Sequence, residues 1–324
     1  MKVLYVGVHY NYGKRAEGFS YEHMNVEAGL RQFCESRGWC MEPWYPDDPK
    51  RLEWASPYWR DNMHHYDAVF HVAFNESLDL PEEAAKFALK QDVPVIQWDC
   101  DSSWRFPNWI LPRKNRVSHF VTTHSATIPW YQQHGMKVIK SQWAGSPEYQ
   151  ITGLPQIYDI SFVGQKHGRM TDGRFFRSEV INAMIAAGLS IDIFGNYWDG
   201  YEKWHGYVTD FQAVIRAFEQ SKICLNLSNP WHFGTMPQIK GRHFEIPQMG
   251  RLQICTPADD LTSYFEPDKE IVIVNSTDEL IEKCKYYLAH DSERDQIAIA
   301  GHTRMLLNHQ WSHRFQYIFK EVGL

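Results

Sequence analysis

Hydrophobic and polar positions follow two different periods along the first 140 residues of the chain. Short apolar runs predict strands at residues 3–8, 68–73, 93–98 and 119–122. Between them, apolar residues three and four positions apart predict helices at 21–36 and 81–90. Strands that alternate with helices favour a parallel, doubly wound sheet, which binds ligands at the carboxyl ends of its strands.

The same pattern starts again after a less regular segment. Residues 141–158 contain two prolines and two glycines, which favour a linker. Further strands are predicted at 159–163, 190–194, 223–227, 252–255 and 270–274, and helices at 174–187, 211–220 and from 277 onward. We therefore expect an α/β chain of two doubly wound, Rossmann-like domains that face each other across a cleft. Such a cleft would bring two ligand sites together and suits transfer between two substrates.

The stretch 236–256, MPQIKGRHFEIPQMGRLQICT, carries the strongest chemical signal. It predicts a helix with Pro237 at the first position and Thr235 as N-cap. One side of this helix would hold Gln238, Arg242, Glu245 and Met249. Cations and helix N–H groups suit a diphosphate, and a carboxylate suits a ribose diol, so the pattern favours a sugar nucleotide. A solvated Lys/Arg face followed by a core turn explains the same residues.

Length and composition indicate a globular protein. A chain of 324 residues exceeds the size at which one hydrophobic core usually stops growing, so two domains are expected. Apolar residues make up 44% and charged residues 22%, and no apolar run is long enough to cross a bilayer. The apolar run at the N-terminus breaks at Asn11, too early for a secretory signal. We expect a cytoplasmic location and no membrane insertion.

Cysteine spacing and net charge indicate the redox compartment of the protein and whether it binds nucleic acid broadly. The six cysteines form no CxxC pair, which favours free thiols in a reducing compartment over disulfides or zinc. A net charge of −6 argues against broad wrapping by nucleic acid, although it permits a local basic groove. The 13 tryptophans include many in loop-like contexts, where aromatic faces stack on sugars or bases, but tryptophan also fills cores.

The C-terminal half contains separate motifs at residues 162–169 (FVGQKHGR), 221–226 (SKICLN), 238–250 (QIKGRHFEIPQMG), 265–288 and 292–314. Together these motifs resemble the CgeB-like, spore-maturation class of group 1 glycosyltransferases. Residues 95–106 and 121–131 show a looser similarity to the same class. The resemblance implies the GT-B architecture, with an acceptor domain at 1–150 and a donor domain at 151–307. It also implies that a helix at 308–322, within a terminal segment 308–324, crosses back onto the first domain.

By the same resemblance, the sugar-nucleotide donor is held by residues of the second domain. These are Gly164, Lys166, Arg169, Asn226, Lys240, Arg242 and Glu245. Glu245 matches the family carboxylate that binds the donor ribose, and Lys240 and Arg242 lie where a diphosphate clamp is expected. The chain departs from the family at Pro237, where many retaining members carry a second glutamate. The motif therefore leaves the identity of the donor sugar open.

Candidate catalytic residues follow from the chemistry of sugar transfer. Negative charge builds on the departing diphosphate, so cations such as Arg242 stabilise the transition state without a metal. We expect no cofactor other than a nucleotide-sugar co-substrate, in the first place a UDP-sugar. A retaining reaction, which we favour, needs no protein base, because the departing phosphate takes the proton. An inverting one needs a base such as Asp99 or Asp101.

Two patterns are weak evidence for a metal. Asp99 and Asp101 form an Asp-x-Asp triplet, but three-letter patterns are common and the expected fold is not the one that uses it. His309 and His313 lie four residues apart without the glutamate of a zinc motif, so helix packing or capping explains them better. We therefore expect no metal ligands in this chain.

The acceptor side is less well defined. The loop after the first strand supplies Tyr10, Asn11, Tyr12 and Gly13, and Trp104 is a further candidate. A plain strand-to-helix turn explains the loop equally well. The acceptor itself stays open: a glycan, a small molecule, a protein or a modified DNA base.

Two other classes of function remain open at this stage. A non-catalytic sugar-nucleotide or glycan-binding protein of the same fold is permitted by Pro237. The second class is a viral-type glycosyltransferase that acts on a hydroxymethylated DNA base flipped into an aromatic cleft. For that class the sequence offers a basic cluster beside Trp104 and Trp109, made of Arg105, Arg113, Lys114 and Arg116. A solvated loop is the simpler explanation of the cluster.

Overall fold

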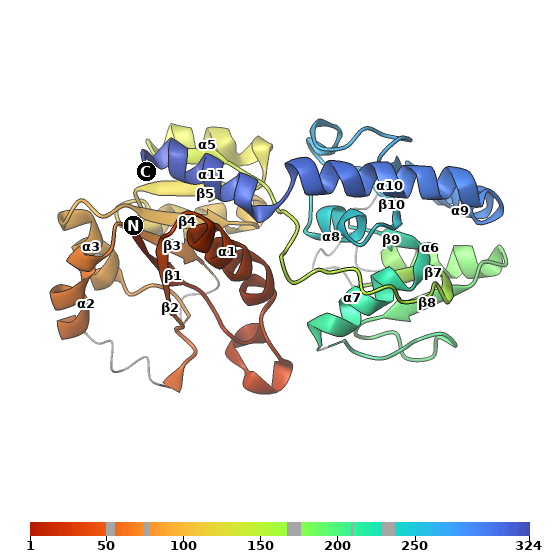
Figure 1. The fold of residues 1–324 in the computed structure, drawn as a ribbon, viewed down its shortest axis with the longest axis horizontal. Coiled ribbons are helices and arrows are strands. Elements are labelled where there is room, and N and C mark those ends of the chain that lie inside the picture. Colours follow the sequence, from red (N-terminus) through yellow and green to blue (C-terminus); the bar gives the residue numbers. More distant parts are fainter. Residues whose placement is uncertain (50–55, 74–77, 167–175, 209, 229–236) are drawn as a thin grey trace. The chain divides into compact units, whose positions relative to one another are not determined.

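The computed structural model describes residues 1–49, 56–73, 78–166, 176–208, 210–228 and 237–324. The chain divides into two compact units (Figure 1). The first unit comprises Met1–Glu148 and Gln310–Leu324, and the second comprises Tyr149–His309. Among the described residues, no helix has the length and apolar character required to cross a membrane.

In the described part of the first unit, the sheet contains six parallel strands in the order β2-β1-β3-β4-β5-β6. They are β1 (Lys2–Val6), β2 (Cys40–Trp44), β3 (Ala68–Val72), β4 (Val95–Asp99), β5 (His119–Thr122) and β6 (Val138–Lys140). The strands β3 and β4 are buried along their whole length. Strands covered by helices on both faces are apolar at most positions, which explains why these two are evident in the sequence although they contain His71, Gln97 and Asp99.

The helices of the first unit connect successive strands, except for the last one. They are α1 (Ala28–Ser36), α2 (Ser56–Asn62), α3 (Glu82–Lys90), α4 (Ser102–Arg105), α5 (Ile128–Gln133) and α11 (Trp311–Val322). A π-helical turn, His23–Glu27, precedes α1. The helix α11 packs against α1 (Figure 1), where a Cβ on Gly29 would lie 2.4 Å from Trp311. The end of the chain thereby completes the core of the first unit.

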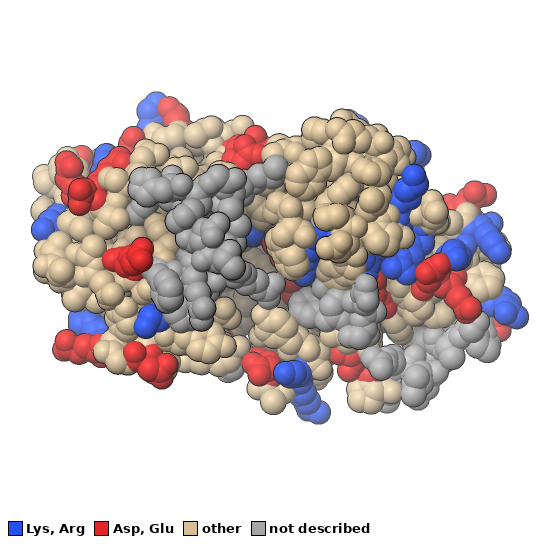
Figure 2. Space-filling view, turned by 180° about the vertical axis from the view of Figure 1, so that it is seen from behind, with Lys and Arg blue, Asp and Glu red and all other residues tan. Residues whose placement is uncertain are grey.

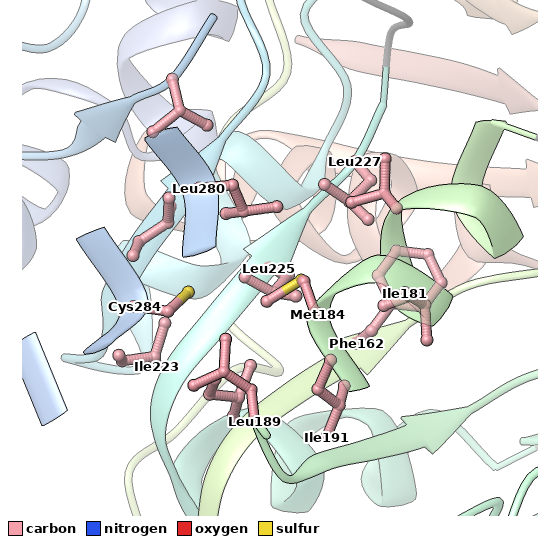
Figure 3. Close-up of a cluster of buried hydrophobic side chains, with 14 of the residues drawn as sticks. Phe162, Ile181, Met184, Leu189, Ile191, Ile223, Leu225, Leu227, Leu280 and Cys284 are labelled. Atoms are coloured by element: carbon pink, nitrogen blue, oxygen red, sulfur yellow. The ribbon is translucent and has the colours of Figure 1, made fainter. Parts of the chain in front are cut away.

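The second unit has its own parallel sheet. Within the described residues it holds β7 (Tyr158–Val163), β8 (Ile191–Phe194), β9 (Ser221–Asn226), β10 (Leu252–Cys255) and β11 (Val272–Ile273), in the order β11-β10-β9-β7-β8. Its helices are α6 (Phe176–Ala186), α7 (Phe211–Glu219), α8 (Arg242–Gln248), α9 (Thr277–Ala289) and α10 (Asp291–Asn308). Figure 3 shows one side of its core, where Met184 of α6 and Cys284 of α9 pack over Leu225 of β9.

The start of the second unit is fixed by one buried carboxylate. Glu219, at the end of α7, is 0% exposed and accepts hydrogen bonds from the backbone N–H groups of Thr152, Gly153 and Leu154, at 2.7, 2.6 and 3.1 Å. These bonds hold the pKa of Glu219 below its usual value, because they favour the charged form over the effect of burial. The irregular segment predicted as a linker is thus anchored to the end of α7 in the second unit.

The predicted fold class, two parallel Rossmann-like α/β domains, is confirmed. Two edge strands escaped prediction. β2 contains Glu42 and Pro43 and is only partly buried, and β6 is three residues long. The predicted helix at 308–322 begins instead at Trp311, because the side chains of Gln310 and His313 form a capping box that starts the helix there.

Candidate functional site

The carboxyl edge of the second sheet is held together by short backbone contacts. The N–H of Gly164, just after β7, donates to Phe194 at 2.8 Å, and the indole N–H of Trp198 donates to the carbonyl of Gly164 at 2.8 Å. Gly195, after β8, has φ +138°, and a Cβ there would lie 2.2 Å from the Gly164 oxygen. Only glycine permits this close approach of the two loops.

Arg177, which the sequence pattern did not indicate as a site residue, connects this edge to the end of β9. Arg177, the second residue of α6, donates from Nε to the Leu227 carbonyl at 3.0 Å and from a terminal nitrogen to the Gln165 carbonyl at 2.9 Å. Burial, together with the charge of Arg242, lowers the pKa of Arg177 to about 10, so it stays protonated at neutral pH. Arg242 thus acts on Arg177 electrostatically, and Arg177 itself joins the loops that follow β7 and β9.

The helix expected to begin at Pro237 begins instead at Arg242, with Gly241 as N-cap. The prediction of the start was wrong because the carbonyl of Pro237 accepts from Asp259 N–H at 2.8 Å and not from the next helical turn. Gln238 therefore lies outside the helix and does not share a face with Arg242. The predicted N-cap, Thr235, lies outside the described residues.

The three charged candidates of this motif, Lys240, Arg242 and Glu245, have different surroundings. The Nζ of Lys240 donates to the Gln238 side chain at 2.7 Å. Arg242 is partly exposed, and within the described structure its Nε is buried without a hydrogen-bond partner. Glu245 lies three residues further along α8 and is 1% exposed. Arg242 is thus the cation of this helix that can still receive an anion.

The other predicted donor residues have mixed surroundings. Lys166 lies 5.1 Å from the centre of the Tyr201 ring, and Gly164 belongs to the loop contact described above. Asn226 is 1% exposed and donates to Gln253 at 3.0 Å, which joins the ends of β9 and β10. Arg169 lies outside the described residues. Gly164 lies in the loop whose Gln165 carbonyl accepts from Arg177. The Asn226 side chain, in contrast, bonds to a neighbouring strand inside the sheet.

In the first unit, the two aspartates after β4 lie in different environments. Asp99 is 2% exposed, accepts from Gln97 Nε2 at 2.9 Å, and has its pKa raised to about 7 by burial. Asp101 is partly exposed at the start of α4, and Trp104 of the same helix is 55% exposed. Asp99 is therefore a core group, and of the two only Asp101 reaches the surface.

The loop after β1 is a small hairpin and not a plain turn. Tyr10 and Phe19 form an antiparallel bridge, and Asn11 N–H donates to Gly18 at 2.9 Å. Tyr12 and Gly13 both have positive φ, 51° and 69°, at the turn of this hairpin. The predicted acceptor loop is thus an ordered structure that the sequence pattern did not indicate.

The basic cluster near Trp109 is largely engaged inside the first unit. Arg113 is 2% exposed, and its Nε donates to the Asp79 carboxylate at 2.8 Å. Arg116 lies 3.8 Å from Asp79, and Lys114 donates to a backbone carbonyl. On the face drawn in Figure 2, basic and acidic side chains are interspersed. The Asp79 carboxylate thus offsets part of the charge of Arg113 and Arg116, whereas Lys114 keeps its charge at the surface.

Comparisons with known proteins agree with this architecture. Residues 174–320 match the model of a glycosyl transferase-like family. Sucrose-phosphate synthase from Thermosynechococcus elongatus superposes with a TM-score of 0.61 at 9% identity, covering 100% of this chain and 99% of that one. Anabaena HepE in complex with UDP gives 0.59 at 12%, covering 100% of both chains. The fold is GT-B.

A further similar structure is an alpha-glucosyltransferase in complex with UDP and a 13-mer DNA, with a TM-score of 0.65 at 12% identity and coverage of 100% and 99%. At these identities the likeness concerns the fold alone. No curated protein matches the chain by sequence. The family match and the GT-B fold together support a group 1 glycosyltransferase family, whereas the CgeB-like class remains a prediction.

The two histidines near the end of this GT-B chain have packing and capping roles, as predicted. His309 is 5% exposed and its Nε2 contacts the Tyr264 carbonyl at 2.8 Å, while His313 caps α11. In the part of the chain that the structure describes, no group of three or more His, Cys, Asp or Glu residues is placed to hold a metal ion.

The buried ion pairs of Asp79 with His71 and Arg113 predict that the stability of the protein depends on pH. His71 and Arg113 hold the pKa of Asp79 at about 2, below its ordinary value of 3.8, despite burial. A carboxyl whose folded pKa is lowered stabilises above the unfolded pKa and loses this contribution as pH falls. We expect the free energy of unfolding to drop by about 2 kcal/mol between pH 4 and pH 2 from this group alone. Urea titrations of Asp79→Asn should lack that part of the decrease in the free energy of unfolding. If the decrease between pH 4 and pH 2 is the same as in the wild type, Asp79 is not the group responsible.

Proposed function

We propose that this protein transfers a sugar from a UDP-sugar to a hydroxyl acceptor, with retention of configuration and without a metal ion. The observation that carries the proposal is Arg177 at the carboxyl edge of the second sheet, hydrogen-bonded to the loops after β7 and β9 and acted on by the charge of Arg242. Two guanidinium groups repel each other, and a bound diphosphate relieves the repulsion while it satisfies the buried Nε of Arg242. The glycosyltransferase family match and the UDP complexes among the similar structures support the same ligand.

The chemistry then follows from where charge develops. Cleavage of the sugar–phosphate bond places negative charge on the diphosphate, which Arg242 stabilises more strongly in the transition state than in the ground state. Asp99 is buried, which makes it a poor base for an acceptor hydroxyl. In this proposal the departing phosphate takes the acceptor proton, which corresponds to retention; Asp101, which reaches the surface, would be the candidate base of an inverting reaction instead.

We assign the ribose to Glu245 and the acceptor to the first unit. A carboxylate accepts both hydroxyl hydrogen bonds of a ribose diol. Because Glu245 is only 1% exposed, a ribose reaches it only after part of its cover has moved. Nucleotide binding is then coupled to a local rearrangement around α8, which should appear as a slow phase in binding kinetics.

Calorimetric titration with UDP, CDP, GDP and ADP in the presence of EDTA tests the proposal. We expect UDP to bind most tightly and added Mn²⁺ to leave its affinity unchanged. Glu245→Gln should weaken UDP binding at least about tenfold, because it removes a charge-assisted hydrogen bond. Glu282→Gln, at an exposed position of α9, serves as the matched control. Equal affinity for all four nucleotides, or binding only with metal, would contradict the proposal.

A further inference from the structure

The hairpin after β1 carries two aromatic rings on one face. Tyr10 and Phe19 are directly opposite each other in the antiparallel bridge, so their side chains project to the same side. Their ring centres are 5.9 Å apart and the planes differ by 11°. Phe19 is 52% exposed. Together the two rings form a flat apolar surface, which we call the hairpin platform.

Ring geometry places both members of the platform over the same face of His9. His9 is stacked with Tyr10 at 4.5 Å and with Phe19 at 5.2 Å, with interplanar angles of 5° and 12°. Rings on opposite faces of His9 would be about 7 Å apart, twice the contact distance of carbon atoms. The observed separation of 5.9 Å is shorter. The platform therefore has one face backed by His9 and leaves the other for a ligand.

The layer beneath the platform is fixed by hydrogen bonds. His9 also packs against His23 and Tyr45, at 4.5 and 4.4 Å. The buried carboxylate of Glu27 holds both of these partners, accepting from Tyr45 at 2.7 Å and contacting His23 Nδ1 at 2.8 Å. The Asp47 carboxylate accepts from the backbone N–H groups of His9 and Tyr10 at 2.9 and 2.8 Å. Such support pre-organises the rings for binding.

We propose that the hairpin platform binds a neutral sugar ring of the acceptor, so that the protein extends a carbohydrate chain or a glycoside. This inference rests on the proposed function and names the acceptor class for it. The C–H face of a pyranose is apolar and packs on a flat aromatic surface, which removes both from water. The hydroxyl groups at the ring edge need acceptors, and carboxylates are the strongest ones available.

Local charge favours a neutral sugar over a nucleotide or a nucleic acid. Residues 9–48 contain seven Asp or Glu and four Lys or Arg. The pKa of Glu22, three residues after Phe19, is raised by burial and by the nearby charge of Asp101, which marks a second carboxylate on this side of the unit. A base would stack on the platform as well, but the carboxylates of this segment outnumber its cations, which include Lys14 and Arg15 of the hairpin, and this net negative charge opposes a phosphate backbone.

The test compares binding of different acceptor classes with and without the platform. Fluorescently labelled protein, saturated with UDP, is applied to an array of neutral oligosaccharides and sialylated or sulfated glycans, and anisotropy is measured with short duplex DNA. We expect retention on neutral oligosaccharides, weakened at least about tenfold by Phe19→Leu. The matched control is Tyr317→Leu, because Tyr317 is 46% exposed on α11 of the same unit. It should bind like the wild type.

Three results would overturn the inference: no retained neutral oligosaccharide, preference for DNA or anionic glycans, or equal binding by Phe19→Leu. UDP affinity is measured by calorimetry on the same preparations and should stay within about twofold in Phe19→Leu, because the platform belongs to the first unit. If the wild-type protein does not bind UDP, that result would instead contradict the proposed function. The two failures are therefore distinguishable.

Discussion

Replacing Arg242 with methionine is expected to lower the rate of sugar release from UDP-glucose by about 100- to 1000-fold. The side chain keeps its length and loses its charge, so the developing charge on the diphosphate loses a pre-placed cation. UDP affinity should fall less, by about tenfold, because a charge-assisted hydrogen bond to the ground state contributes less than one to the transition state. The measurement is UDP production with the acceptor glycan, or with water where no acceptor is added.

The matched control for this variant is Arg216→Met. Arg216 has a side chain that is 52% exposed on α7 of the same unit and pairs with Asp210 at 3.2 Å. Its loss changes the net charge equally and leaves the edge of the sheet intact. Equal losses of rate in the two variants would show that Arg242 acts only through the overall charge, and would contradict its place in the site.

Gly195→Ala is expected to destabilise the second unit by about 3 kcal/mol and to abolish UDP binding. Two costs combine: a side chain at φ +138° is strained, and its Cβ would lie 2.2 Å from the backbone oxygen of Gly164. Because the obstacle is backbone, the loops after β7 and β8 have to separate. The loop that receives the Arg177 hydrogen bond then moves. Urea unfolding and UDP calorimetry measure the two effects.

Gly188→Ala separates strain from clash. Gly188 has φ +83°, but a Cβ there meets nothing within 4 Å. It should cost only about 1 kcal/mol, the strain alone, and leave UDP affinity unchanged. If both glycine variants behave alike, the close approach of Gly164 and Gly195 has no part in organising the site.

The fold was predictable because of how parallel sheets are buried. The strands β3 and β4 are covered on both faces and are apolar at most positions, so the alternation of strands and helices was evident. β2 escaped because an edge strand can carry Glu42 and Pro43 without losing core contacts. The start of α8 escaped because a long-range bond from Asp259 to Pro237 overrides a local N-cap signal.

The site was only partly predictable for a different reason. The charged residues around Arg242 lie in one contiguous stretch of the chain, so the sequence alone indicates that they can bind a diphosphate and a ribose. Arg177 contributes through carbonyls of Gln165 and Leu227, which belong to separate loops, and no spacing in the sequence predicts that meeting. The hairpin platform likewise depends on the bridge between Tyr10 and Phe19, which lie nine residues apart; the turn residues between them do not indicate that the two rings pair.

A nucleoside diphosphate is expected to bind at the carboxyl edge of the second sheet, beside Arg177 and Arg242, and a structure of the protein with UDP tests this site. In that structure the Arg242 guanidinium should lie within about 3 Å of a diphosphate oxygen, with the ribose hydroxyls on Glu245. UDP bound to the first unit, or bound with Arg242 beyond hydrogen-bond distance and Glu245 still covered, would contradict it.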